Sequence, residues 1–235
     1  MKMARKQVVL IIVEGPSDQT ALGFAFNNYL TSDYVHIEVM HRDITTEKGA
    51  TSSNIITKIN DIINIYANNY HIRKTDIRQV VHLTDIDGTF IKDDKINYDE
   101  QAIDPIYETT GIKTNNVEGI KNRNIQKKSI LVKLSQTQQI GPIPYKLFYM
   151  SSNLDHVFYN KPNSTKEEKE IDSHNFAKKY KTDFEKFVSF LSDSTISYQG
   201  NYRDSWKYII QEEEKILRLT NLNLFFEKAE KTQGG

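Results

Sequence analysis

The sequence predicts an α/β fold, in which helices flank a parallel sheet, followed by a helical C-terminal extension. The short apolar run at residues 7–13 is rich in β-branched residues, which is typical of a parallel strand buried on both faces. Helical and strand patterns then alternate, which favours parallel strands joined by right-handed crossovers. We therefore expect an α/β domain at residues 1–150, a helical extension at 151–227 and a frayed tail at 228–235.

The first strand is followed by a helix signal, because Pro16 suits the first helical turn. That helix should run to about Leu30. Alternation predicts a second strand, and Ser52 or Ser53 can cap a long helix ending near Tyr70. The expected strands after the first are 35–40, 78–84 and 145–150.

The remaining segments give weaker patterns. Residues 88–117 show little periodicity and are expected to be an insertion or a long loop. The expected helices beyond it are 125–134, 153–161, 166–192 and 202–219.

The composition restricts the classes of function. The 235 residues include no cysteine, which excludes disulfides, thiolate metal sites and cysteine nucleophiles. The 31 basic and 31 acidic residues balance, so nucleic acid must be bound by local patches. The longest apolar run is too short for a membrane span or a secretory signal. We therefore expect a cytoplasmic protein with no membrane partner.

Carboxylates follow two of the predicted strands. Glu14 follows the first strand, and Asp85 and Asp87 follow the third, where ligands bind in open parallel sheets. If the chain stays extended, both aspartates point to one face and Glu14 faces them. Three such carboxylates repel one another unless a divalent cation lies between them, and oxygen ligands favour Mg²⁺ or Mn²⁺. Singly, each could be a helix-terminus charge or part of a turn.

The residues VEGPSD at 13–18, followed by DID at 85–87, resemble the signature of the Toprim domain. Among Toprim proteins, the chain is most similar to stand-alone OLD-type and RloB-like phage-defence nucleases. The resemblance implies Mg²⁺-dependent phosphodiester hydrolysis, with Glu14 as the general acid/base and Asp85 and Asp87 as metal ligands. Asp18 is either a further ligand or a charge at a helix N-terminus. OLD proteins usually carry an ATPase, and since no GxxxxGK[ST] motif exists here, any ATPase must be a separate chain. A homo-oligomer is left open.

Two alternative functions remain open. The DIDGTF stretch at 85–90 also resembles the first motif of HAD phosphohydrolases, in which Asp85 would be the nucleophile. That motif normally follows the first strand, and residues 150–235 show no strand-ending acidic pair. The second alternative is a non-catalytic Toprim binding module, although a scaffold has no physical need for three clustered carboxylates.

Two further groups of residues are candidates. Asp155 follows the last predicted strand and is either an additional metal ligand or a charge on the first turn of a helix capped by Asn153. His156 is more typical of a structural histidine. A basic stretch could bind a nucleic-acid backbone or could be a solvated helix face; it contains Lys121, Arg123, Lys127, Lys128 and Lys133.

Overall fold

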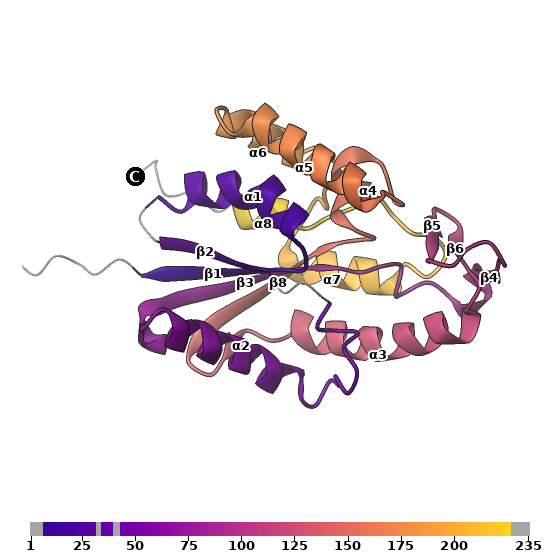
Figure 1. Cartoon of the computed structure of the whole chain (residues 1–235), viewed down its shortest axis with the longest axis horizontal. Coiled ribbons are helices and arrows are strands. Elements are labelled where there is room, and N and C mark those ends of the chain that lie inside the picture. Colours follow the sequence, from indigo (N-terminus) through magenta and orange to yellow (C-terminus); the bar gives the residue numbers. More distant parts are fainter. Residues whose placement is uncertain (1–6, 32–33, 40–42, 227–235) are drawn as a thin grey trace, which may run out of the picture.

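A five-stranded sheet forms the centre of the computed structural model, which describes residues 7–31, 34–39 and 43–226 (Figure 1). Its strand order is β2-β1-β3-β8-β7, and only the short β7 runs antiparallel to its neighbour. The predicted α/β class with a mostly parallel sheet is thus confirmed. The strands are β1 (Val8–Val13), β2 (Tyr34–Val39), β3 (Ile77–Asp85), β7 (Gln139–Ile140) and β8 (Ile143–Met150).

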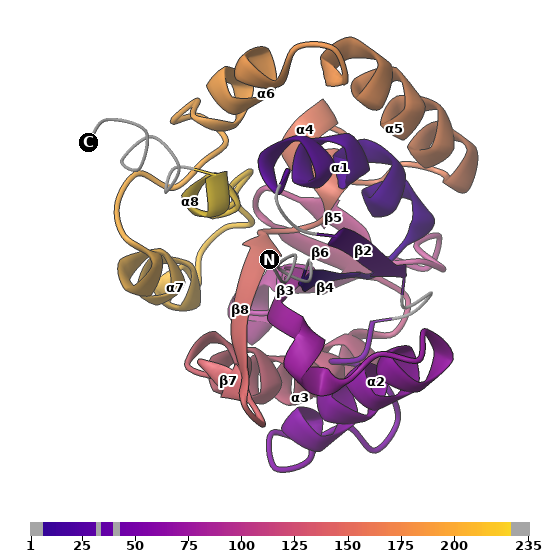
Figure 2. The same cartoon turned by 90° about the vertical axis from the view of Figure 1, so that its left-hand side faces the viewer.

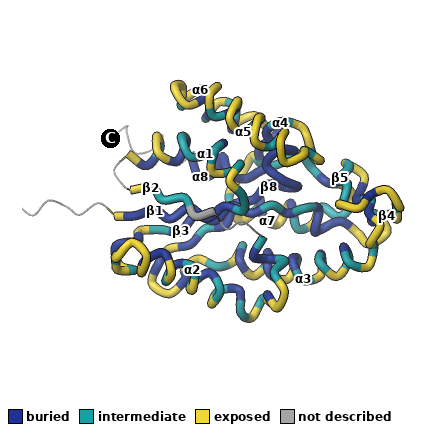
Figure 3. Tube along the Cα trace, viewed as in Figure 1, coloured by how far each residue is buried: buried dark blue, intermediate teal, exposed yellow. Residues whose placement is uncertain are grey.

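Helices cover both faces of this sheet, so β1 is buried along its whole length, as its unbroken apolar run predicts (Figure 3). One face carries α1, α4, α5, α6 and α8, and the other carries α2 and α3 (Figures 1 and 2). The bounds are α1 (Pro16–Tyr29), α2 (Ile55–Asn69), α3 (Val117–Ser135), α4 (Leu154–Tyr159), α5 (Lys166–Tyr180), α6 (Phe184–Leu191), α7 (Tyr202–Gln211) and α8 (Asn223–Phe226).

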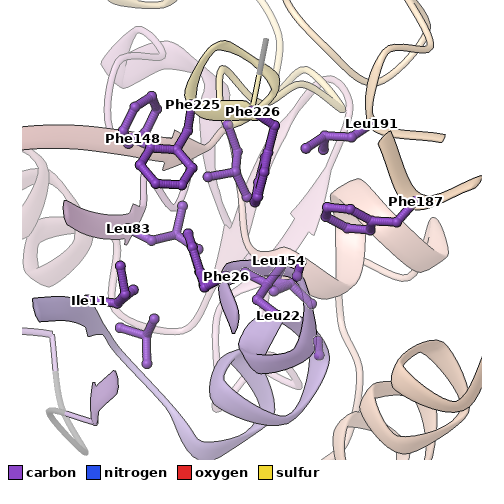
Figure 4. Packing of buried hydrophobic residues seen from close by; sticks show 14 of the residues in the cluster. Ile11, Leu22, Phe26, Leu83, Phe148, Leu154, Phe187, Leu191, Phe225 and Phe226 are labelled. Carbon is purple, nitrogen blue, oxygen red and sulfur yellow. The ribbon is translucent and has the colours of Figure 1, made fainter. Parts of the chain in front are cut away.

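The core on the α1 face is strongly aromatic. Phe26 of α1 packs against Phe225 and Phe226 of α8, with ring centroids 5.5 and 5.7 Å apart (Figure 4). Phe148 of β8 lies 5.8 Å from Phe225, and Phe187 of α6 completes the cluster. The last described helix therefore packs directly against the first helix and the sheet.

The opposite core is built from α2, α3 and α7. Ile55, Ile59 and Ile63 recur at helical spacing and face the sheet. The N-terminus of α2 differs from the prediction, since Asn54 occupies the cap position and neither Ser52 nor Ser53 does. Helix α7 lies beside β8, where the Tyr202 hydroxyl donates to the backbone oxygen of Leu147 at 2.8 Å (Figure 2).

Residues 88–117 fold into a small sheet rather than a long loop. It contains β4 (Ile96–Tyr98), β6 (Gly111–Thr114) and β5 (Ile106–Glu108), in that spatial order. A buried cluster that includes Ile91, Ile112 and Ile216 holds it together. This sheet lies at the end of the molecule towards which β1 runs (Figure 1). Two 3-10 turns, Lys74–Asp76 and Asp93–Lys95, precede β3 and β4.

The C-terminal helices are shorter than predicted. The helix expected at 166–192 is split into α5 and α6, because Asp183 caps α6 by accepting from the backbone N–H of Lys186. The helix expected at 202–219 ends at Gln211, and the chain then runs alongside β8. There Asn221 accepts from the backbone N–H of Tyr149 at 2.9 Å, and Thr220 donates to its carbonyl at 2.6 Å.

Two expectations concern segments at or beyond the limits of the described chain. The tail at 228–235 and the end of the second predicted strand at Met40 lie outside the described residues.

Within the described residues, no helix is both long enough and apolar enough to cross a membrane.

Candidate functional site

The carboxyl ends of β1 and β3 meet at one edge of the sheet, because these strands are parallel neighbours. Glu14, directly after β1, accepts two hydrogen bonds on its Oε1 atom. The backbone N–H of Asp85 donates one at 2.9 Å, and the Thr84 hydroxyl donates the other at 2.8 Å. The structure thus joins Glu14 to the end of β3, although these residues are far apart in the sequence.

A pocket of about 530 Å³ opens at this edge. Its acidic wall consists of Glu14, Asp18, Asp43, Asp85 and Asp155. Helix α5 also lines the pocket, through Lys166, Lys169, Glu170, Ser173 and His174. A second pocket of about 490 Å³, between the small sheet and residues 162–165, shares Asp85 and Lys169 with the first. Asp85 therefore lies where the two pockets meet.

The central carboxyl groups bind protons more tightly than usual. Burial, followed by the nearby charges of Asp43 and Asp87, raises the pKa of Glu14 to about 8, although Lys127 opposes this. Burial, followed by the charges of Glu14 and Asp18, raises the pKa of Asp85 well above its usual range. Among the described residues, no hydrogen-bond donor contacts the Asp85 carboxylate. The cluster is therefore short of positive charge on the Asp85 side.

Asp18 and Asp155 extend the acidic wall. The Asp18 carboxylate accepts from the backbone N–H of Gly15 at 2.9 Å, so it does cap the start of α1. Burial raises its pKa to about 6, and the charge of Asp155 adds to this shift. Asp155 is 4% exposed; one of its oxygens lies 3.5 Å from Lys169 Nζ, and the other, Oδ1, has no partner within the described part of the chain. One carboxylate oxygen of Asp155 is thus buried without a hydrogen-bond partner.

Asp87 departs from the extended chain that the sequence predicts. Its φ is 53° and that of Gly88 is 63°, so the backbone turns directly after β3. The Asp87 carboxylate accepts from Lys127 Nζ at 2.6 Å, and the same ammonium donates to Asp43 at 2.6 Å. In an extended strand, side chains two residues apart point to the same face. Because the chain turns here, Asp85 and Asp87 have different contacts instead.

The residues of the basic stretch do not share one exposed face. Lys127 is fully buried, so it cannot contact a nucleic-acid backbone. Arg123 donates to the Asp87 carbonyl and to the Tyr107 hydroxyl, both at 2.8 Å. Lys121 and Lys128 form surface ion pairs with Glu118 and Glu213, and Lys133 is exposed. The reason is helical periodicity, since positions 123 and 127 of α3 face the site rather than solvent.

The neighbouring residues after β8 have structural roles. Asn153 caps α4 by accepting from the backbone N–H of His156 at 2.8 Å, which confirms the cap interpretation. Burial lowers the pKa of His156 to about 4, so its ring is neutral at physiological pH. Neither residue supplies a charge to the pocket.

Sequence reasoning missed three contributors to the site: Asp43, Thr84 and Lys169. A usable signal existed for Asp43, because a carboxylate stands at the end of each of the four parallel strands or a few residues beyond it. In sheet order these are Asp43, Glu14, Asp85 and Asp155. Lys169 had no such signal, since it lies on a helix with as many acids as bases.

The carboxylate oxygens of the site suit a hard divalent cation chemically, although they are not arranged as a complete coordination shell. Across residues 7–31, 34–39 and 43–226, no three Asp, Glu or His side chains already converge as a metal site. Nevertheless, the uncontacted Asp85 carboxylate and the unpartnered Asp155 Oδ1 are the oxygen ligands that Mg²⁺ and Mn²⁺ prefer.

Comparison with protein-family models, curated proteins and solved structures finds no match to this chain. The assignment of roles therefore rests on the geometry of the site and on the sequence motifs.

Proposed function

We propose that this chain is a Mg²⁺- or Mn²⁺-dependent nuclease of the Toprim type, which hydrolyses phosphodiester bonds in nucleic acid. The observation that carries the proposal is the pairing of Glu14 with the end of β3. It sets an acid/base carboxyl group beside Asp85, at the edge of a parallel sheet where ligands bind.

Glu14 has the properties of a general acid/base. With a pKa near 8 it exchanges a proton readily at neutral pH. Its Oε1 atom is fixed by Thr84 and by the Asp85 backbone, and among the described residues no donor contacts Oε2. Oε2 is therefore available to take a proton from an attacking water or to return one to a leaving oxygen.

The remaining residues would hold the ion and the phosphate. Asp85, with Asp18 and Asp155 beside it, would hold a divalent ion. When bound, such an ion neutralises phosphate oxygens and lowers the pKa of a bound water. Lys166 and Lys169 of α5 line the same pocket and would attract the negatively charged substrate. In this proposal α5, rather than the basic stretch of α3, supplies the positive charge that faces the substrate.

The resemblance to phage-defence nucleases extends the proposal to biology. We infer an effector of an anti-phage or abortive-infection system, acting in the cytoplasm and with a separate ATPase as its partner. This inference rests on the motif alone.

The test is cleavage by the purified chain of pooled tRNA, single-stranded DNA and plasmid, with Mg²⁺, with Mn²⁺ and with a chelator. We expect cleavage of at least one substrate with an ion present and none after chelation. Asp85→Asn should lower the rate at least about 100-fold. Asp61→Asn, on the exposed side of α2, is the matched control and should leave the rate unchanged. Cleavage that is insensitive to chelation would contradict the proposal.

A further inference from the structure

Lys127 is a buried cation that the proposed reaction does not use. It lies in the middle of α3, and its side chain is 0% exposed. Its Nζ atom lies 2.6 Å from Asp43 Oδ2 and 2.6 Å from Asp87 Oδ2. A buried ammonium without partners would strongly destabilise the fold, so the two carboxylates are what allow this one to be buried.

The surroundings of Lys127 are built to hold both carboxylates in place. Gln126, the preceding residue, donates to the carbonyls of Thr45 and Glu47 at 3.1 Å, which ties the loop after β2 to α3. One turn earlier, Arg123 donates to the carbonyl of Asp87 at 2.8 Å. Asp43 is further fixed because its Oδ1 accepts from the backbone N–H of Thr45 at 2.7 Å. The ammonium thus lies at a fixed point between two loops.

The place of Lys127 Nζ is one that a metal ion could take. Without the ammonium, Asp43 and Asp87 would offer a divalent ion carboxylate oxygens, the ligands that Mg²⁺ and Mn²⁺ prefer. The ammonium therefore balances the charge of Asp43 in the acidic wall and that of Asp87 beside it. On the other side of the site, Asp85 has no hydrogen-bond donor in the described chain, and Asp155, although it pairs with Lys169 at 3.5 Å, keeps a buried Oδ1 without a partner there.

We propose that Lys127 is a resident cation that takes the place of a second divalent ion between Asp43 and Asp87. The site then binds a single divalent ion, on the side of Asp85 and Asp155. Lys127 is a positioning residue in this account, since it acts by holding Asp87 and Asp43. The catalytic role of this ion rests on the proposed function. The number of bound ions, however, is measured without any reaction.

The test is titration of the metal-free full chain with Mn²⁺, with free Mn²⁺ followed by electron paramagnetic resonance. We expect one ion per chain. Asp85→Asn should weaken its binding at least about tenfold, whereas Asp87→Asn should change the affinity less than about twofold. Two ions per wild-type chain, no ion, or a tenfold loss in Asp87→Asn would overturn the proposal.

A second variant tests the replacement directly. Lys127→Ala vacates the space between Asp43 and Asp87, so the folded variant should bind two Mn²⁺ ions; one ion would contradict the replacement. If this variant does not fold, the comparison of Asp85→Asn with Asp87→Asn decides. A chain that binds one ion in the expected pattern but cleaves no nucleic acid would contradict the proposed function and leave this inference standing.

Discussion

At the scale of single residues, burial of Glu14 among other carboxyl groups has a measurable effect on stability. The pKa of Glu14 is about 8 in the folded chain and 4.5 in its ordinary state. Between these pH values the folded chain keeps a proton that the unfolded chain has released, so stability falls as pH rises. Burial lowers the pKa of His82 and of His156 to about 4, so these residues contribute a slope of opposite sign that fades as the pH rises above 6.5 and their rings become neutral in the unfolded state as well.

The prediction is a loss of stability in the metal-free protein between pH 6.5 and 8. Because Glu14 is partly exposed, we expect about 1 to 2 kcal/mol from this residue. Glu14→Gln should remove that part of the slope, as measured by urea unfolding with a chelator present. Glu185→Gln, on the exposed side of α6, should keep the wild-type slope. Equal slopes in wild type and Glu14→Gln would contradict the electrostatic description.

The residues of the site were only partly predictable. Glu14 and Asp85 could be paired from the sequence, because the ends of neighbouring parallel strands meet. The turn at Asp87 could not, since it depends on a left-handed backbone that aspartate adopts in particular contexts. The burial of Lys127 was equally hidden, because a lysine in a basic stretch gives no sign of carboxylates contributed by distant loops.

At the scale of elements, long and strongly patterned segments were predictable, whereas short strands were not. The first strand and the helix after it were confirmed almost to the residue. The strands of the small sheet contain three or four residues each, which is too few for a periodic signal. That sheet matters to the site, because Tyr107 in β5 accepts from Arg123, which in turn holds the Asp87 carbonyl.

Gly111 gives a prediction at this scale. Its φ is 155°, and a Cβ atom there would lie 2.1 Å from the backbone oxygen of Lys95. Gly111→Ala should therefore push β4 and β6 apart and lower the free energy of unfolding by about 2 kcal/mol or more.

The control is Gly141→Ala, which also has a positive φ, of 58°, but meets no atom within 4 Å. It should cost about 1 kcal/mol, from backbone strain alone. Chemical denaturation of both variants compares their losses in the free energy of unfolding. Equal losses would contradict the predicted steric clash between the new Cβ atom and the backbone of Lys95.

At the scale of the whole molecule, the last described segment joins β8 to the aromatic core. Asn221 and Thr220 bond to the backbone of Tyr149, and Phe225 packs on Phe26 and Phe148. Sequence patterns placed helices in this region, but they could not show that the chain returns to β8, because long-range contacts leave no periodic trace.

We therefore predict that residues 7–226 unfold as one cooperative unit. Far-UV circular dichroism and the fluorescence of the buried Trp206 should give coincident transitions. A fragment of residues 1–150 should lack a cooperative transition, since it exposes the apolar surface that α4, α6 and α8 cover. Two separate transitions, or a folded fragment, would contradict this expectation.

The central claim, that Glu14 acts as the acid/base of a metal-dependent nuclease, is tested most directly by comparing wild type with Glu14→Gln. Both are assayed with Mg²⁺ on nucleic acids and on a generic phosphatase substrate, with circular dichroism to show that the variant is folded. The account predicts that nucleic-acid cleavage falls at least about 100-fold in the variant. Cleavage by Glu14→Gln at the wild-type rate would contradict the account. So would phosphatase activity that survives Glu14→Gln but is lost in Asp85→Asn, which would favour the HAD alternative.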